Sequence, residues 1–279
     1  MKIIFHDDYK NSTYAPDTAA AEGRMEAIMD LLSKESGYSV LKPVAAGIED
    51  LLRAHTRGHV DKIGQDEKLF HMASLAAGGA ISAAQIALDG EPAFACIRPP
   101  GHHASSDSRW GFCYFNNMGV ALLKLRAKGQ IKSAFVLDFD AHTGDGNIDV
   151  LSEYPEIKIL NPFADDRNAY IEKIEKTLND IKGVDIIAVS AGFDSYEKDL
   201  GKKLKTFDFY LMGRLLKKAS KRLCNGRRFA ILEGGYYLPD LGKNVLAFCQ
   251  GLAGTETSES TLTPRHRGGK SDLLSRLRH

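Results

Sequence analysis

The sequence predicts a single α/β domain of three layers, α/β/α, with a mostly parallel central sheet. Short apolar runs alternate with longer helical patterns along most of the 279 residues. Such alternation is typical of strand–helix–strand units, whose strands pair in parallel and are covered on both faces by helices. Residues suited to chemistry follow several of these runs, at the strand ends where parallel sheets bind their ligands.

The expected strands are short apolar runs bounded by polar or turn-forming residues. In chain order they are Lys2–Phe5, Ser39–Leu41, Ala93–Ile97, Ala134–Phe139, Ile157–Leu160, Ile186–Ser190 and Phe229–Leu232. Parallel neighbours need long crossover connections, and the intervening segments provide them. We expect helices at Ala19–Leu32, Glu67–Leu88, Asn116–Lys128, Ala169–Ile181, Phe207–Arg222 and Leu241–Gly251.

No internal repeat or change of composition divides the chain before residue 254, so we expect residues 1–254 to form one domain. Residues 255–279 start with the polar, low-complexity stretch Thr255–Thr263 and continue with a basic end. This composition is typical of a solvated, flexible tail. A segment that binds a partner or a nucleic acid is the alternative.

The composition argues against several classes of function. The net charge is +1, so no overall field attracts nucleic acid or an anionic membrane. The four cysteines are widely spaced and include no C-x-x-C pair, which suits a reducing cytoplasm better than a disulfide framework or a cysteine zinc site. The N-terminus lacks a signal-peptide core, and no apolar run approaches the roughly 18 residues that span a bilayer. We expect a soluble cytoplasmic protein without membrane or nucleic-acid partners.

Asp138, Asp140 and His142 follow a buried apolar run, and Asp194 follows another. Such groups are costly to desolvate unless a cation or hydrogen bonds compensate. Catalytic zinc usually keeps three protein ligands and leaves one position for water, and Asp140, His142 and Asp194 match that number. The D-x-D-x-H pattern alone is a weaker signal, because paired carboxylates also cap helices and form ion pairs.

His102 and His103 follow Pro99-Pro100-Gly101, a segment that favours a turn in which both imidazoles face one cavity. Amide hydrolysis needs a base for the water and an acid for the leaving amine, and histidine can serve as both. Each imidazole also needs an orienting carboxylate, for which Asp138 and Asp145 are available. A histidine pair on an ordinary polar loop is the simpler alternative.

Two adjacent phenols, Tyr236 and Tyr237, follow the glycines Gly234 and Gly235 near the last expected strand. The glycines allow the backbone to turn tightly and to approach a site closely. A phenol beside a metal is suited to donate a hydrogen bond to a developing oxyanion. Spacing does not decide between the two tyrosines.

The same glycines, together with Gly111 and Phe112, are the residues that we expect along a substrate channel. Phe112 is the candidate for a channel wall that contacts an acyl group. An ordinary packed aromatic is almost as plausible for Phe112, and it is the favoured interpretation for Trp110.

Five motifs together resemble the histone deacetylase and acetylpolyamine amidohydrolase superfamily. They are RPPGHHA (Arg98–Ala104), GFCYFNN (Gly111–Asn117), DFDAHTGDGN (Asp138–Asn147), SAGFD (Ser190–Asp194) and EGGY (Glu233–Tyr236). Weaker agreement runs from about Leu51 to about Gly251, so the resemblance covers nearly all of the expected domain. As a set the motifs are highly specific.

The resemblance implies the arginase–deacetylase fold and a zinc-dependent hydrolase that removes an acetyl or other acyl group from an amine. The substrate would be acetyl-lysine, an acetylpolyamine or a small N-acyl amine. It further implies that Asp140, His142 and Asp194 are the zinc ligands. His103 would be the general base and acid, and His102 its electrostatic partner. Asp138 and Asp145 would orient the two histidines, and the Tyr236 phenol would polarise the acyl carbonyl.

The chain departs from the family pattern at several positions. Thr143 replaces the usual second histidine, which is not a ligand. The serine that assists a structural potassium ion in relatives is absent from Lys158–Asn161, so a potassium site is doubtful. Two rim segments, around Gly64–Leu69 and Pro162–Asn168, are shorter than usual. Asp66 or Glu67 and Phe163 are weak candidates to replace the missing rim residues.

Two alternatives belong to other classes. A manganese ureohydrolase would continue D-A-H-x-D and would have S-x-D-x-D, but Gly144 and Gly192 stand where those carboxylates are required. A catalytically silent module that only binds acylated ligands would keep the pocket. Iron(II) or cobalt(II) would fit the same ligands as zinc. The oligomeric state does not follow from the sequence.

Overall fold

The computed structural model describes residues 1–255. Its centre is a seven-stranded sheet with the order β2-β1-β3-β7-β6-β4-β5, and every neighbouring pair is parallel. The strands are β1 (Lys2–Ile4), β2 (Ser39–Leu41), β3 (Ala93–Ala95), β4 (Ala134–Asp138), β5 (Ile157–Leu160), β6 (Ile186–Ala191) and β7 (Arg228–Leu232). The predicted fold class, a single α/β domain with a parallel sheet, is confirmed.

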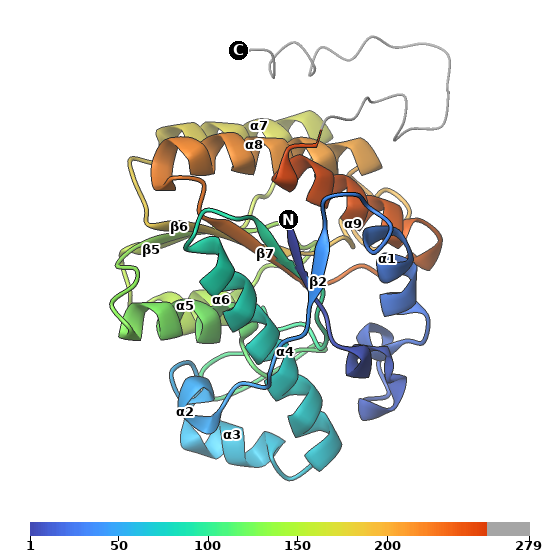
Figure 1. Ribbon diagram of the computed structural model, residues 1–279, viewed down its shortest axis with the longest axis vertical. Coiled ribbons are helices and arrows are strands. Elements are labelled where there is room, and N and C mark those ends of the chain that lie inside the picture. The colour runs from blue at the N-terminus through green and yellow to red at the C-terminus, as the bar shows by residue number, and fades with distance from the viewer. Residues whose placement is uncertain (256–279) are drawn as a thin grey trace.

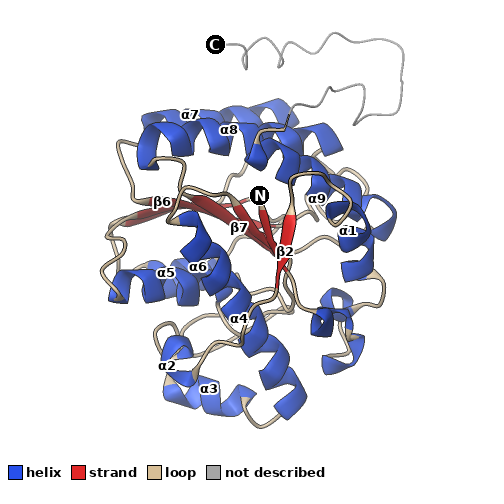
Figure 2. Cartoon of the chain, in the orientation of Figure 1, coloured by secondary structure: helices blue, strands red, loops and turns tan. Residues whose placement is uncertain are grey.

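Helices cover both faces of this sheet (Figures 1 and 2). One layer contains α1 (Arg24–Leu32), α7 (Arg167–Asp180), α8 (Thr206–Cys224) and α9 (Leu238–Ala253). The other contains α4 (Glu67–Ala87), α5 (Asn117–Ala127) and α6 (Asp145–Leu151), and the short helices α2 (Ile48–Leu51) and α3 (Arg57–Ile63) lie beyond α4. The three predicted layers are therefore present.

The predicted elements differ from the observed ones mainly at their ends. The helix expected at Ala19–Leu32 is split, because Gly23 adopts a positive φ of 78° and α1 begins only at Arg24. The short helices α2, α3 and α6 were not predicted. Each has only 4 to 7 residues, so tertiary packing and capping rather than periodicity stabilise them. Residues 256–279 of the expected tail lie outside the described part of the chain.

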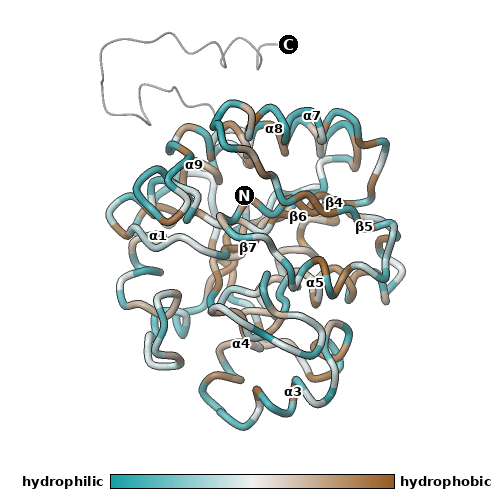
Figure 3. Tube along the Cα trace, turned by 180° about the vertical axis from the view of Figure 1, so that it is seen from behind, coloured by the Kyte–Doolittle hydropathy of each residue, from teal (hydrophilic) through white to brown (hydrophobic). Residues whose placement is uncertain are grey.

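The apolar character of the chain is concentrated in the central strands, β4 and β6 among them (Figure 3). All residues of β4 and β6 are buried. Phe139 and Phe193, immediately beyond these strands, are fully buried and pack edge to face with ring centroids 5.7 Å apart. Their neighbours Asp138, Asp140 and Asp194 are thereby held by a rigid aromatic core at the ends of the strands.

Helix α4 is the one helix among residues 1–255 that is long and apolar enough to cross a membrane. The sequence analysis predicted this helix at Glu67–Leu88 but did not name it as a membrane candidate, because polar residues interrupt its apolar character. More than half of its apolar window is buried, and the helix contacts β1, β3, β7 and α5. A core helix passes the same test of length and composition, so this feature is weak support for a membrane span.

Candidate functional site

Four segments that are distant in the sequence meet at the carboxyl-terminal edge of the sheet. They are the loop after β3 and the residues that follow β4, β6 and β7. The register places Asp138 opposite Ser190, and Ala191 opposite Leu232, so the polar residues beyond these strands emerge at the same level. This is the edge at which parallel sheets bind ligands.

Asp140, His142 and Asp194 form a group whose potential ligand atoms all lie within 4.8 Å of one another. Nδ1 of His142 lies 3.0 Å from Oδ1 of Asp140 and 3.2 Å from Oδ2 of Asp194. The latter oxygen is buried and makes no hydrogen bond. Two buried carboxylates, one imidazole and one unsatisfied oxygen fit a divalent cation such as zinc.

The protonation equilibria of this group also fit a cation. Burial, together with the charge of Asp140, raises the pKa of Asp194 to about 7. The neighbouring carboxylates of Asp140 and Asp194 raise the pKa of His142 to about 10. Without a metal, His142 and part of the Asp194 population therefore retain protons at neutral pH, whereas the pKa of Asp140 is lowered by the neighbouring histidines. A bound divalent cation would replace those protons.

Two glycines allow the backbone to approach these carboxylates. Gly234 donates its backbone N–H to Oδ2 of Asp140 at 3.0 Å, and a Cβ there would lie 2.6 Å from the same oxygen. At Gly192 a Cβ would lie 2.1 Å from it. Larger residues at either position would displace a carboxylate of the candidate metal site.

The structure brings His102 and His103 together at the same edge, each on its own carboxylate. Nδ1 of His102 lies 3.2 Å from Oδ2 of Asp138, and Nδ1 of His103 lies 2.6 Å from Oδ1 of Asp145. Both imidazoles are buried, and their ring centroids are 3.9 Å apart. Asp138 and Asp145, the two carboxylates expected to orient the imidazoles, thus lie within hydrogen-bonding distance of them.

The pKa values of the two imidazoles are shifted in opposite directions. Burial disfavours the charged form of His102, but the carboxylates of Asp140 and Asp138 outweigh burial and raise its pKa well above the usual value. Burial and the positive charge of His102 lower the pKa of His103 to about 4. His103 is therefore neutral at pH 7, as a general base must be. A cation on Asp140 would weaken the hold of that carboxylate on the His102 proton.

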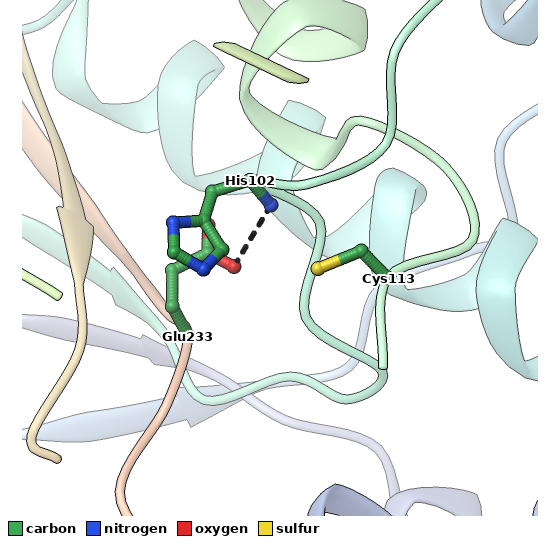
Figure 4. A group of neighbouring side chains, drawn as sticks. All are labelled: His102, Cys113 and Glu233. Carbon is green, nitrogen blue, oxygen red and sulfur yellow. Dashed lines mark hydrogen bonds between the residues drawn. The ribbon is translucent and has the colours of Figure 1, made fainter. Parts of the chain in front are cut away.

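A second group of potential ligands consists of His102, Cys113 and Glu233 (Figure 4). The Glu233 carboxylate already accepts hydrogen bonds from the backbone N–H of Gly101 at 2.7 Å and of His102 at 3.3 Å, and from Oγ of Ser190 at 3.0 Å. These bonds connect β7 to β6 and to the histidine loop. Glu233 therefore holds the backbone of the loop that carries His102.

The sequence analysis assigned no role to Glu233. The signal for it was a lone acid directly after an apolar strand, the same signal that singled out Asp194. Burial raises the pKa of Glu233 to about 7.

A cavity of about 170 Å³ opens at this edge. It is lined by His103, Asp140 and His142 and by the side chains of Trp110, Phe112 and Tyr236. Of the predicted channel glycines, Gly111 and Gly234 line it as well. Gly235 does not: it faces the core, where a Cβ would lie 2.8 Å from Leu241 and 2.9 Å from Phe193. That prediction was wrong because consecutive residues point in different directions.

The structure separates the two tyrosines. Tyr236 lines the cavity, and its ring lies 5.8 Å from that of Phe112, edge to face. Tyr237 instead packs near Tyr196, with ring centroids 6.3 Å apart. Asp199, which the sequence analysis missed, accepts the backbone N–H groups of both tyrosines at 2.6 and 2.8 Å. Burial raises the pKa of the Tyr236 phenol above its usual value, so it remains a hydrogen-bond donor.

Trp110 is not the ordinary packed aromatic that the sequence analysis favoured. Its side chain is half exposed, and its ring centroid lies 3.7 Å from that of His103. Its indole Nε1 donates a hydrogen bond of 2.6 Å to Asp145. Trp110 therefore belongs to the site.

The weak candidates for a rim lie elsewhere. Asp66 caps α4 by accepting the backbone N–H of Leu69 at 3.0 Å, and Glu67 lies in the first turn of that helix. Phe163 is 75% exposed, with Lys203 above its ring. The segment Lys158–Asn161 lacks the serine that was sought there for a potassium site. In this segment Oδ1 of Asn161 accepts a hydrogen bond from the backbone N–H of Gly144 at 2.8 Å.

Comparison with known proteins identifies the class to which this fold and site belong. A family model described as the histone deacetylase domain matches residues 18–182 and 166–252. The chain belongs to the histone deacetylase family, and the resemblance stated from the motifs is confirmed.

Individual relatives agree with this family. A probable deacetylase of Archaeoglobus fulgidus is 30% identical over 99% of this chain and 94% of its own length. The acetylpolyamine amidohydrolase of Mycoplana ramosa is 25% identical over 91% of this chain and its full length. The crystal structure of the HDA15 HD domain has a TM-score of 0.79 over 93% of this chain and 91% of that chain, at 22% identity. This structure shows the likeness of fold.

Proposed function

We propose that the protein is a metal-dependent amide hydrolase that removes an acetyl or other acyl group from an amine. Membership of the histone deacetylase family supports the reaction class. The observation that carries the proposal is local: the Asp140–His142–Asp194 group and two carboxylate-bound histidines line or adjoin one cavity.

Asp140, His142 and Asp194 would hold the metal. Zinc suits this donor set, and iron(II) or cobalt(II) would be accepted by the same ligands. When bound, the cation supplies Lewis acidity toward the acyl carbonyl and lowers the pKa of water.

His103 is the general base and then the general acid. Its Nδ1 is committed to Asp145, so Nε2 is left to accept a proton from the attacking water and to return it to the leaving amine. His102, which shares its proton with Asp138, supplies positive charge beside the forming oxyanion. The separation of their proton affinities supports this division of roles.

The Tyr236 phenol donates a hydrogen bond to the oxygen of the acyl carbonyl as negative charge develops there. Its position on the cavity and its raised pKa support this role. Phe112, edge to face with Tyr236, contacts the acyl group or the chain that bears the amide. The substrate is an acylated amine: acetyl-lysine in a peptide, an acetylpolyamine or a small N-acyl amine.

We place this activity in the cytoplasm, which four free, buried cysteines suit. The test is release of the free acid from a panel of acetyl-lysine peptides, acetylpolyamines and longer acyl-lysines by the zinc-loaded protein, with His103→Ala as the blank. Turnover of one class that is absent in the variant supports the proposal. Equal rates in both proteins, or no turnover by zinc-, iron- and cobalt-loaded protein, would refute it.

A further inference from the structure

Trp110, the sole tryptophan of the chain, contacts both members of the His103–Asp145 pair. Its Nε1 donates a hydrogen bond of 2.6 Å to Oδ2 of Asp145, whose Oδ1 lies 2.6 Å from Nδ1 of His103. Its ring lies against the imidazole, with centroids 3.7 Å apart and 34° between the planes. One side chain thus restrains the carboxylate through an oxygen and the imidazole through its face.

The loop that carries Trp110 is attached independently to α6, the helix that begins at Asp145. Asp149, one turn further along α6, accepts hydrogen bonds from the backbone N and from Oγ of Ser106, at 2.8 and 2.9 Å. Ala104 and Arg109 pair across the loop in an antiparallel bridge. The indole therefore meets the carboxylate in a geometry that other contacts already maintain.

We propose that Trp110 is a positioning residue for His103, acting through Asp145. A carboxylate bound through one oxygen can still rotate about its terminal torsion, and the imidazole that it holds rotates with it. The bond from Trp110 to the second oxygen removes that freedom, and the indole face limits tilting of the imidazole. The inference rests on the proposed function, because it gives His103 the role of general base.

A second consequence concerns the wall of the cavity. Because Trp110 is half exposed and lines the cavity, its ring also borders the space for substrate. A role of Trp110 in positioning His103 and a role in lining the cavity predict different kinetic effects of its replacement. Loss of a positioning bond lowers kcat, whereas loss of a wall that contacts substrate and transition state equally raises KM.

The hydrogen bond can be tested without metal or substrate. Since the chain has one tryptophan, its ¹⁵N–¹H spectrum contains a single indole N–H signal. A short bond to a carboxylate should move this signal downfield and slow its exchange with water. We expect Asp145→Ala to move it upfield and to speed its exchange, and Asp185→Ala, on a distant loop, to leave it unchanged. A signal that Asp145→Ala does not alter would overturn the proposal.

The role in catalysis is tested with the metal-loaded enzyme. Trp110→Phe keeps an aromatic ring and removes the N–H, so we expect kcat to fall about tenfold while KM stays within about twofold. Leu200→Ala, which trims the same cavity, should raise KM instead. In an Asp145→Ala background, Trp110→Phe should have no further effect on kcat, because the two residues act as one unit.

Equal losses of kcat from Trp110→Phe in both backgrounds, or an effect on KM alone, would overturn the proposal. Failure of the proposed function looks different. In that case the wild type turns over none of the acylated amines, while the indole signal still reports whether Trp110 holds Asp145.

Discussion

Oδ2 of Asp194 lies 3.2 Å from Nδ1 of His142, is buried, and makes no hydrogen bond. Burying a carboxylate oxygen without a hydrogen bond costs free energy, so a native protein that does so normally has another use for the oxygen. The adjacent carboxylate of Asp140 makes the arrangement still less favourable without a cation. The arrangement therefore predicts that Asp194 binds a cation at the candidate metal site.

Asp194→Asn should lose most of the bound metal while the protein stays folded. The amide cannot supply the negative charge, but it has nearly the same shape and can still accept the backbone N–H of Ala141, which lies 2.9 Å from Oδ1 of Asp194. Metal content per chain after dialysis measures the loss, and circular dichroism confirms the fold. Asp61→Asn, at an exposed position on α3, is the matched control. Full metal content in Asp194→Asn would contradict the assignment.

Gly192→Ala should disrupt the same site by steric means. The added Cβ would lie 2.1 Å from Oδ2 of Asp140 and 2.5 Å from its Cα, so the backbone or the ligand must move. We expect a loss of about 1–3 kcal/mol in the free energy of unfolding and a lower metal content. Gly58→Ala is the control, because open space surrounds Gly58 within α3; it should raise stability by up to about 1 kcal/mol. Unchanged metal affinity in Gly192→Ala would show that the carboxylate is not constrained there.

The strands were predictable because central strands of a parallel sheet are apolar throughout, as β4 and β6 are. Their order in the sheet was not, since it depends on contacts between distant segments. The association of the Asp140, His142 and Asp194 side chains followed from strand ends alone. The contact between Trp110 and Asp145 did not follow from the sequence, because the two residues are 35 positions apart and a loop determines how they meet.

Tyr236→Phe should lower kcat by about 10²–10³-fold, the loss seen when one oxyanion donor is removed. The substitution keeps the ring against Phe112 and leaves the backbone bond to Asp199 in place. Tyr237→Phe is the matched control, because that ring packs near Tyr196 and does not line the cavity. Initial rates for both variants, at equal metal content, make the comparison. A similar loss in both would indicate a structural effect of the segment.

The stability of the fold should fall as the pH drops from about 6.5 toward 4, and His55 is one cause. Its Nε2 accepts the backbone N–H of Asn116 at 2.8 Å and its Nδ1 lies 2.9 Å from the carbonyl oxygen of Ser105, so the neutral imidazole fits both partners. Burial, with the neighbouring His59, lowers the pKa of His55 to about 4. The unfolded chain, with a histidine pKa near 6.5, therefore binds more protons than the folded chain between these pH values.

The contribution of His55 is complete above about pH 6.5 and is lost progressively as the pH falls to about 4, a change of roughly 3 kcal/mol at most. Urea unfolding at several pH values measures it in the wild type and in His55→Gln, whose amide cannot titrate. The variant should be less stable at pH 7, and its stability should depend less on pH within this window. Parallel pH profiles for the two proteins would mean that His55 binds its proton equally in the folded and unfolded chains.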